Sequence, residues 1–148
     1  MKKIFFIIFL LNVSCGYAPV NKLTNKNYSI IEFEANGNNQ INTILKRNFV
    51  KYNKENLKRQ FKLEASSQLE KATSSKKQTG DSSVLSIKIL INLKILENDK
   101  NLKELSYEEF SSYNSLDNKF ELKQYEKILI NSLTDKILSK IHFDLASM

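Results

Sequence analysis

The sequence contains very little cysteine, histidine or glycine, and each shortage excludes a class of protein. Cys15 is the only cysteine among 148 residues, so no internal disulfide can form. His142 is the only histidine, which leaves no histidine-based metal cluster and no Cys–His nucleophile pair. Gly16, Gly37 and Gly80 lie too far apart for a glycine-rich phosphate loop. We therefore expect no cofactor, no metal and no enzymatic activity.

Carboxylates are present, but they do not form a catalytic pair. Glu108 and Glu109 are adjacent, and neighbouring residues of a strand point to opposite faces, so the two cannot act on one bond together. Asp99 is a third, isolated candidate. His142 is expected to cap or pack near the end of the last helix. The acidic residues therefore do not change the expectation of a non-enzyme.

Long apolar runs are also missing, and the only candidate lies at the amino terminus. Lys2 and Lys3 precede an apolar run from Ile4 to Leu11, and a small residue and a cysteine follow shortly afterwards. A bilayer-spanning helix needs about 20 apolar residues, and this run is far shorter. The pattern of charged start, short apolar run and small residue is typical of a removable export signal.

Ser14 and Cys15 place the cleavage site. A small residue followed by an obligatory cysteine is what signal peptidase II requires, and a thioether-linked diacylglycerol gives a lone exported cysteine a purpose. Gly16 stands where an aspartate would favour retention at the inner membrane, so the outer membrane is the expected destination. We predict a signal peptide over 1–14, a lipidated tether over 15–27 and one domain over 28–148. An unlipidated secreted protein with a stray thiol is the alternative.

The net charge of +7 comes almost entirely from lysine, since only Arg47 and Arg59 are arginine. Asparagine and isoleucine are also abundant, as in proteins from AT-rich genomes, so the lysine surplus is weak evidence for a polyanionic partner. The positive charge is compatible with an anionic glycolipid in the envelope. A basic nucleic-acid-binding domain is an alternative, but the export signal argues against it.

The first half of the domain shows one strand and one helix. Ile31 and Phe33 alternate with glutamates over 28–35, which predicts a half-buried strand. Apolar residues at spacings of three and four then predict a helix of about fourteen residues, with Asn38 or Asn39 as its cap. The apolar residues of this helix are Ile41, Ile44, Leu45, Phe49 and Tyr52.

The middle of the chain predicts three strands. A second strand begins at Phe61, a polar loop is expected over 72–83, and strict alternation over 85–96 predicts the clearest strand. A turn over 97–101 leads into a last strand over 102–113, with a bulge or early end expected at Glu108–Glu109. Tyr107, Phe110 and Tyr113 on that strand are more typical of core and sheet surface than of a binding stripe.

The last third predicts a long helix, with Asp117 or Ser115 as its cap. Its apolar stripe contains Leu122, Tyr125, Leu129, Leu133, Ile137 and Ile141, and is widened by Ile128, Ile130 and Leu138. The element order strand, helix, three strands, helix predicts an α+β fold in which two helices cover one face of a four-stranded sheet.

These features together resemble the LptE family, the lipopolysaccharide-assembly lipoproteins. The resemblance rests on Cys15-Gly16-Tyr17-Ala18-Pro19 after the signal, on a first strand leading into a helix that carries Asn39-Gln40 and Leu45-Lys46-Arg47-Asn48, on a strand hairpin ending in Tyr113, and on the final helix. It spans the whole chain.

The resemblance implies a non-enzymatic partner of LptD, the outer-membrane barrel that delivers lipopolysaccharide to the cell surface. It implies a one-to-one complex in which the lipoprotein plugs the barrel, helps it assemble and binds lipopolysaccharide through basic residues. Lys76 and Lys77, in the expected polar loop, are the candidate glycolipid contacts, unless they belong to a solvated loop. Lys88, Asn92 and Lys94 are candidate positions for contact with the barrel wall. An envelope lipoprotein of another assembly or lipid-trafficking system is the alternative.

Overall fold

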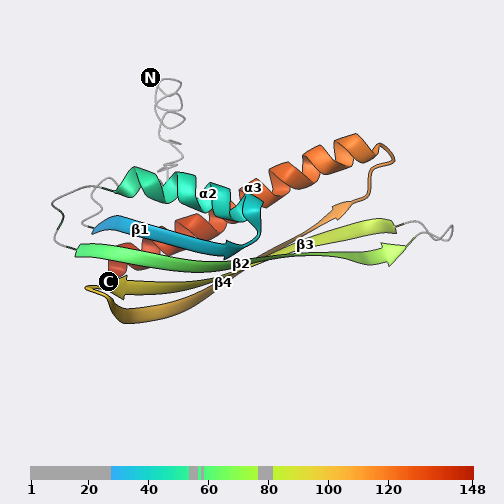
Figure 1. Ribbon diagram of the computed structural model, residues 1–148. Helices are drawn as coiled ribbons and strands as arrows, with labels where there is room; N and C mark the ends of the chain where they lie inside the picture. The colour runs from blue at the N-terminus through green and yellow to red at the C-terminus, as the bar shows by residue number, and fades with distance from the viewer. Residues whose placement is uncertain (1–27, 54–56, 58, 77–81) are drawn as a thin grey trace, which may run out of the picture.

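A computed structural model describes residues 28–53, 57, 59–76 and 82–148 (Figure 1). The predicted order of strands and helices and the α+β class are confirmed, with a short 3-10 helix, η1, as the only addition among these residues. The elements are β1 (Tyr28–Gly37), α2 (Asn39–Phe49), η1 (Val50–Tyr52), β2 (Arg59–Lys76), β3 (Ser82–Glu97), β4 (Lys100–Asn114) and α3 (Lys119–Ser147).

The four strands form one sheet in the order β1-β2-β3-β4. β1 is parallel to β2 and reaches it through the crossover of α2, whereas β2, β3 and β4 are an antiparallel meander. One core cluster joins the inward residues of β3 to residues of both helices, so both helices cover the same face. The opposite face of the sheet carries no helix among the described residues (Figure 1).

β3 forms the floor of the core, as its alternation predicted. Its inward residues are all at most 1% exposed, and burial of each such side chain contributes roughly 1.5–3 kcal/mol. They pack beneath the buried face of α3, which includes Leu133, Ile137 and Ile141. The inward residues of β3 are Ile87, Ile89, Ile91, Leu93 and Ile95.

β1 contains a bulge that corrects the predicted facing of its residues. Ile30 is 3% exposed, whereas Ile31, expected to point inward, is 41% exposed. The pairing with β2 shifts register between Ile30 and Glu32, which inserts one residue and exchanges the faces on either side of it. Strict alternation cannot reveal such an insertion, because the sequence on each side of it is still alternating.

Gly37 turns the chain from β1 into α2. Its φ is +97°, and a Cβ atom there would lie 2.0 Å from the carbonyl oxygen of Ser67, so only glycine fits. Asn38 then caps the helix, its side-chain oxygen accepting hydrogen bonds from the N–H groups of Gln40 and Ile41. This confirms the first of the two predicted caps. The α-helix is shorter than expected, because its last turn tightens into η1.

The polar stretch expected as a loop over 72–83 is largely strand. β2 continues to Lys76 and β3 begins at Ser82, with Ala72 paired with Ser86 and Thr73 with Leu85. The prediction was wrong because main-chain hydrogen bonds with β3 hold this segment, and its side chains through position 75 are exposed and need not be apolar.

The β3–β4 hairpin turns more tightly than the expected five residues. Asn98 and Asp99 both have positive φ, at 53° and 59°, and form a two-residue turn of the kind that the sheet twist favours. The only register shift between these strands lies beside the turn, between Ile95 and Leu96. The expected bulge at Glu108–Glu109 is wrong: both residues pair regularly with β3, and inward-facing Glu109 binds Lys140 of α3 at 2.7 Å.

α3 begins at Lys119 and is capped by Asn118, not by Asp117 or Ser115. The second half of the helix packs against both the sheet and α2, whereas the first half extends alone over the far end of the sheet (Figure 1). The expected wide stripe is therefore buried in part. Ile130 and Leu138 are 3% exposed, whereas Ile128 is 65% exposed.

Candidate interaction surfaces

The residues singled out from the sequence lie at the margins of the described structure. Cys15 and Lys77 are outside the described residues, and Lys76 is the last residue of β2, a position known only for its backbone. The contradicted loop prediction therefore moves Lys76 to a strand end.

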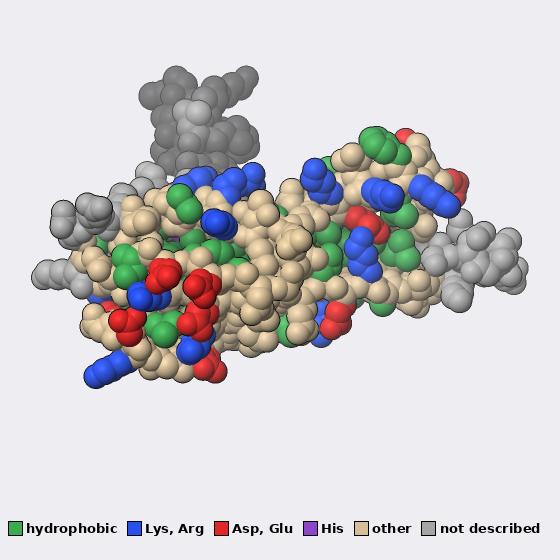
Figure 2. Space-filling model, in the orientation of Figure 1, with side chains coloured by type: hydrophobic (Ala, Val, Ile, Leu, Met, Phe, Trp, Pro, Cys, Tyr) green, Lys and Arg blue, Asp and Glu red, His purple; other side chains and the backbone are tan. Residues whose placement is uncertain are grey.

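A row of three lysines runs along the first half of α3, near the same end of the sheet. Val84 of β3 pairs with Ser75 on one side and with Asn114 on the other, so β2 and β4 end together and α3 starts close by. Spacings of four residues place the three lysines on one flank of the helix, and all are exposed. None forms an ion pair within the described part of the chain, and Figure 2 shows basic side chains along this helix. The lysines are Lys119, Lys123 and Lys127.

This lysine flank was not identified in the sequence. The lysines over 119–127 recur at a spacing of four residues in the sequence, but the prediction for this helix rested on its apolar stripe alone. A search for charge at helical spacing would have found it. The flank matters because it is the part of α3 that α2 does not cover.

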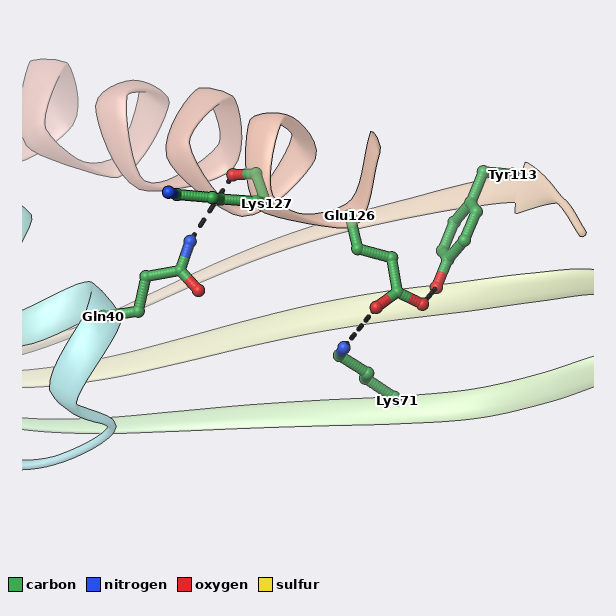
Figure 3. Close-up of polar contacts among 5 residues, drawn as sticks. All are labelled: Gln40, Lys71, Tyr113, Glu126 and Lys127. Atoms are coloured by element: carbon green, nitrogen blue, oxygen red, sulfur yellow. Dashed lines mark hydrogen bonds and ion pairs between the residues drawn. The ribbon is translucent and has the colours of Figure 1, made fainter. Parts of the chain in front are cut away.

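A cluster of three polar side chains around the Glu126 carboxylate fixes the first half of α3 to the sheet (Figure 3). Glu126 of α3 binds the Lys71 ammonium of β2 at 2.5 Å and accepts a hydrogen bond of 2.6 Å from the Tyr113 hydroxyl of β4. Burial by itself would raise the pKa of Glu126, but Lys71, Tyr113 and nearby Lys123 outweigh it and hold the pKa below the ordinary 4.5. Burial and the carboxylate also raise the pKa of Tyr113. The cluster ties α3 to β2 and to β4, the strands on either side of β3.

Gln40 at the start of α2 marks the boundary between the two halves of α3. Its side-chain amide donates to the main-chain oxygen of Lys127 at 3.4 Å and to the side chain of Asn131 at 3.2 Å (Figure 3). α2 begins at Asn39, so it does not extend over the part of α3 that precedes Lys127. Asn131 lies four residues after Lys127 on the same flank of α3, so its hydrogen bond with Gln40 shows that this flank faces the side on which α2 connects β1 to β2. The lysine flank therefore overlooks the β2 side of the sheet.

The face of the sheet without helices is polar and carries cross-strand ion pairs. Lys88 binds Glu108 at 3.0 Å, and Lys94 binds Glu64 at 3.2 Å. Asn92 lies between the two lysines on the same face and is exposed. All three positions expected for barrel contact therefore lie on this polar face. An open hollow of about 450 Å³ crosses its middle, lined by Asn36, Glu64, Ser66, Asn92, Lys94, Glu104 and Ser106 among others.

The three aromatic residues of β4 separate onto two faces. Tyr107 and Tyr113 are each 6% exposed on the helix-covered face, and their hydroxyls donate to Asp144 and Glu126 of α3. Phe110 is 57% exposed on the opposite face, where it pairs with Lys88. These positions agree with the interpretation as core and sheet surface, and the three side chains do not form one stripe.

His142 is buried between β1 and α2. Its Nδ1 lies 2.6 Å from the Tyr28 hydroxyl, and its Nε2 lies 2.7 Å from the side-chain oxygen of Asn48. Nε2 donates to that amide oxygen, and Nδ1 and the Tyr28 hydroxyl share the second hydrogen bond, so both ring nitrogens have partners. His142 therefore packs within the second half of α3, as expected, and ties that half to β1 and α2.

The described residues contain no group of three or more histidine, cysteine, aspartate or glutamate side chains placed to hold a metal ion. Glu108 and Glu109 point to opposite faces, as the strand geometry predicted, and each has its own lysine partner. Over the same residues, no helix has the length and apolar character that crossing a membrane would require.

Comparison with known proteins gives likeness in structure but not in sequence. No protein-family model matches the chain, and no curated protein matches its sequence. Among solved structures, a minor lipoprotein from Acinetobacter baumannii is 13% identical, with 81% of this chain and 92% of that chain covered at a TM-score of 0.62. Lipoprotein B from Nitrosomonas europaea is 14% identical, with 80% and 84% covered at a TM-score of 0.58.

A third structure, rare lipoprotein B from Shewanella oneidensis, is 13% identical, with 76% of this chain and 93% of that chain covered at a TM-score of 0.53. Identities this low show likeness of fold, and the likeness extends over most of each chain. The sequence resemblance predicted this outcome. The chain has the fold of rare lipoprotein B, the LptE type of lipoprotein.

Proposed function

We propose that this protein is a lipid-anchored, non-enzymatic lipoprotein of the outer membrane that plugs an LptD-type barrel and binds lipopolysaccharide during its delivery to the cell surface. The observation that carries the proposal is the LptE-type fold, joined to the sequence pattern that predicts a signal peptide over 1–14 followed by Cys15. Three features support its separate parts: Cys15, the polar face of the sheet, and the end of the β2–β3 hairpin where Lys76 and Lys77 lie in the sequence.

The anchor is a diacylglycerol on Cys15, with the domain at the periplasmic side of the outer membrane. Metabolic labelling with radioactive palmitate should mark the protein, and Cys15→Ser should abolish the label and release the protein from the membrane. Cleavage without lipid would instead give an unlabelled soluble protein from the wild-type sequence. That result would favour the simple secreted alternative.

The polar face of the sheet supports enclosure in a barrel. The lumen of a large outer-membrane barrel is polar, so the surface that meets it must be polar and able to form hydrogen bonds. Lys88, Asn92 and Lys94 give the outer face this character, and its ion pairs are exposed. Photo-crosslinkers at these three positions should capture the barrel in cells, whereas one at buried Ile91 should capture nothing.

Co-purification tests the partnership itself. A plug enclosed by a barrel leaves slowly, so lipoprotein and barrel should remain in equal amounts through a long detergent wash. Depletion of the lipoprotein should leave the barrel misassembled and lipopolysaccharide missing from the surface. If mass spectrometry finds only a soluble periplasmic factor, or if depletion changes neither barrel assembly nor surface lipopolysaccharide, the protein serves another assembly or lipid-trafficking system.

The basic end of the β2–β3 hairpin supports the proposal that the protein binds lipopolysaccharide. Lys76 ends β2, Lys77 follows it in sequence, and Lys119 begins the helix that starts near the same end. Lysine binds phosphate as a point charge, and lipid A phosphates need several such charges. Changing all three lysines to glutamate should weaken lipopolysaccharide binding at least about tenfold, since several attractive charges become repulsive.

A matched variant controls for net charge. Lys88→Glu with Lys94→Glu and Lys62→Glu makes the same change of charge on the outer face, where each lysine already has a carboxylate partner. This variant should bind lipopolysaccharide about as well as the wild type. Equal losses in both triple variants would indicate attraction by overall charge and no site at the hairpin end.

A further inference from the structure

β2 has a free edge in its second half. β1 pairs with β2 only as far as the partners Gly37 and Ser67, whereas β3 pairs with β2 to its end at Lys76. Among the described residues, no strand lies beside Gln68–Ala72 on the β1 side. β1 stops there because the conformation of Gly37 turns the chain upward into α2.

The main chain of this edge faces outward at alternate residues. The carbonyl of Ser67 accepts a hydrogen bond from the N–H of Asn38 at 3.1 Å, so Ser67 directs its main-chain groups toward β1. Residues two and four positions further along a regular strand face the same way, and the pairing with β3 has no register shift over this stretch. Leu69 and Lys71 therefore present N–H and C=O groups to the free edge.

The lysine flank of α3 lies above this edge. Lys71 is joined to Glu126 of α3, Lys123 lies close enough to lower the pKa of that carboxyl, and Gln40 holds the main chain of Lys127. Glu126 is neutralised by Lys71, whereas Lys123 and Lys127 have no ion-pair partner in the part of the chain that the structure describes. A strand added beside Gln68–Ala72 would pass beneath two unneutralised cations.

We propose that Gln68–Ala72 is a strand-addition site for an extended acidic segment of another polypeptide. Such a segment would continue the line of β1, form main-chain hydrogen bonds with Leu69 and Lys71, and direct carboxylates on its helix-side face toward Lys123 and Lys127. Side chains alternate along a strand, so the segment should carry acidic residues at every second position. The inference deepens the proposed barrel partnership and rests on it only for the identity of the partner.

Charge argues against pairing of this edge with a second copy of the chain. Two edges joined about a two-fold axis would place both helices on the same face, with the two lysine flanks turned toward each other. Lys123 and Lys127 of one copy would then repel those of the other. An acidic strand removes that repulsion.

The test uses the full-length protein in detergent micelles and a synthetic peptide in which valine and glutamate alternate. Peptide binding should shift the amide resonances of Leu69 and Lys71 and slow their hydrogen exchange, since both N–H groups become bonded. A peptide with lysine in place of glutamate should bind at least about tenfold more weakly, because attraction to two lysines becomes repulsion. Equal binding of the two peptides would overturn the charge argument.

Two substitutions at one position isolate the main-chain contact. Lys71→Ala and Lys71→Pro both remove the ion pair with Glu126, but only proline removes the N–H at the free edge, and proline is tolerated where that N–H has no strand partner. Both variants leave Glu126 unneutralised, so the alanine variant is the reference for the proline variant: proline should abolish the peptide binding that alanine retains, in variants with matching circular dichroism. Binding that survives proline would exclude strand addition.

The remaining variants distinguish binding of the glycolipid from addition of a strand. Lys123→Glu with Lys127→Glu should weaken binding of the acidic peptide at least about tenfold and leave lipopolysaccharide binding unchanged. The triple variant of Lys76, Lys77 and Lys119 should weaken lipopolysaccharide binding and leave peptide binding unchanged. If lipopolysaccharide micelles displace the peptide and both properties respond to Lys123 and Lys127, the flank is a glycolipid site and the strand proposal fails. Co-purification of the barrel would be unaffected by that failure.

Discussion

The two halves of the sheet are covered in different ways. Near Phe61–Ser67 of β2, both helices lie above the strands, and an apolar core fills the space between them, with polar links such as those from His142 to Tyr28 and from Tyr107 to Asp144. Over Gln68–Lys76, only the first half of α3 lies above the strands, held by Glu126 and bordered by exposed apolar and basic side chains. We call these the two-helix half and the one-helix half.

The difference teaches where stability and binding are to be sought. A side chain buried between a sheet and two helices cannot be shortened without leaving a cavity, whereas a half-exposed one can. The one-helix half leaves main-chain groups, cations and apolar side chains in contact with solvent at small cost to the fold. On the helix-covered face, stability should therefore concentrate in the two-helix half and recognition in the one-helix half.

The largest expected effect is loss of an aromatic side chain from the two-helix half. Phe49 is 1% exposed and packs edge-on against Phe33, with ring centroids 4.9 Å apart. Phe49→Ala should lower the free energy of unfolding by about 3–5 kcal/mol, measured by urea denaturation. Phe120→Ala in the one-helix half, where the ring is 69% exposed, should change it by less than about 0.5 kcal/mol. Similar losses in the two variants would refute the distinction between the halves.

The next effect concerns the junction that ends β1. Gly37→Ala adds a Cβ 2.0 Å from a main-chain oxygen at a φ of +97°, so the strand end must move. The free energy of unfolding should fall by about 2 kcal/mol or more, because the neighbour is backbone and cannot rotate away. Ala at neighbouring Asn36, an exposed strand position, is the control and should be nearly neutral. A stable Gly37→Ala variant would show that α2 can start elsewhere.

A smaller effect tests the start of α3 in the one-helix half. Asn118→Ala removes the side-chain oxygen that accepts from the N–H groups of Phe120 and Glu121, and should cost about 1 kcal/mol in thermal or urea unfolding. Asp117→Ala and Ser115→Ala, at the two caps expected from the sequence, should cost much less. A larger loss of stability in either of these variants would indicate that the helix begins at a different residue.

The smallest effect is a pH-dependent one at Glu126. Because its folded pKa lies below the ordinary 4.5, the carboxylate stabilises the fold above that pH, and this contribution disappears as the pH falls through the folded value. Glu126→Gln should cost about 1 kcal/mol at pH 7 and progressively less below pH 4.5. Glu108→Gln, in an exposed pair with Lys88, is the matched control and should cost less than about 0.5 kcal/mol. A pH-independent difference at Glu126 would mean that its charge is not what matters.

The sequence revealed the two-helix half far better than the one-helix half. Alternation over 85–96 and the three-and-four spacing from Ile41 to Phe49 both report burial against an apolar layer, and both gave correct elements. The segment 72–75 is strand without such a pattern, because its backbone bonds with β3 hold it while its side chains stay exposed. Periodicity measures burial, so it is silent where a strand is solvated on both faces.

The candidate contacts were harder to predict than the fold. Lys76 was predicted in a loop and lies at a strand end. The lysine flank was not predicted, because nothing in a linear pattern says that α2 begins opposite Lys127 and leaves the first half of α3 uncovered. The facing of Ile30 and Ile31 depends on a bulge, which is a property of the pairing with β2 and not of β1 alone. Contacts of this kind are set by neighbours distant in the chain.

The turn at Asn98–Asp99 also bears on the order in which the protein folds. A two-residue connection closes the β3–β4 hairpin at little cost in chain entropy, and β2 adds to it from the adjoining stretch of sequence. Tyr28 reaches Arg59 only across the whole of α2, so the parallel pair should form late. The strand made first by the ribosome would then be the last to dock. Until it does, the β1-facing edge of β2 is open along its entire length and is a template for misassembly.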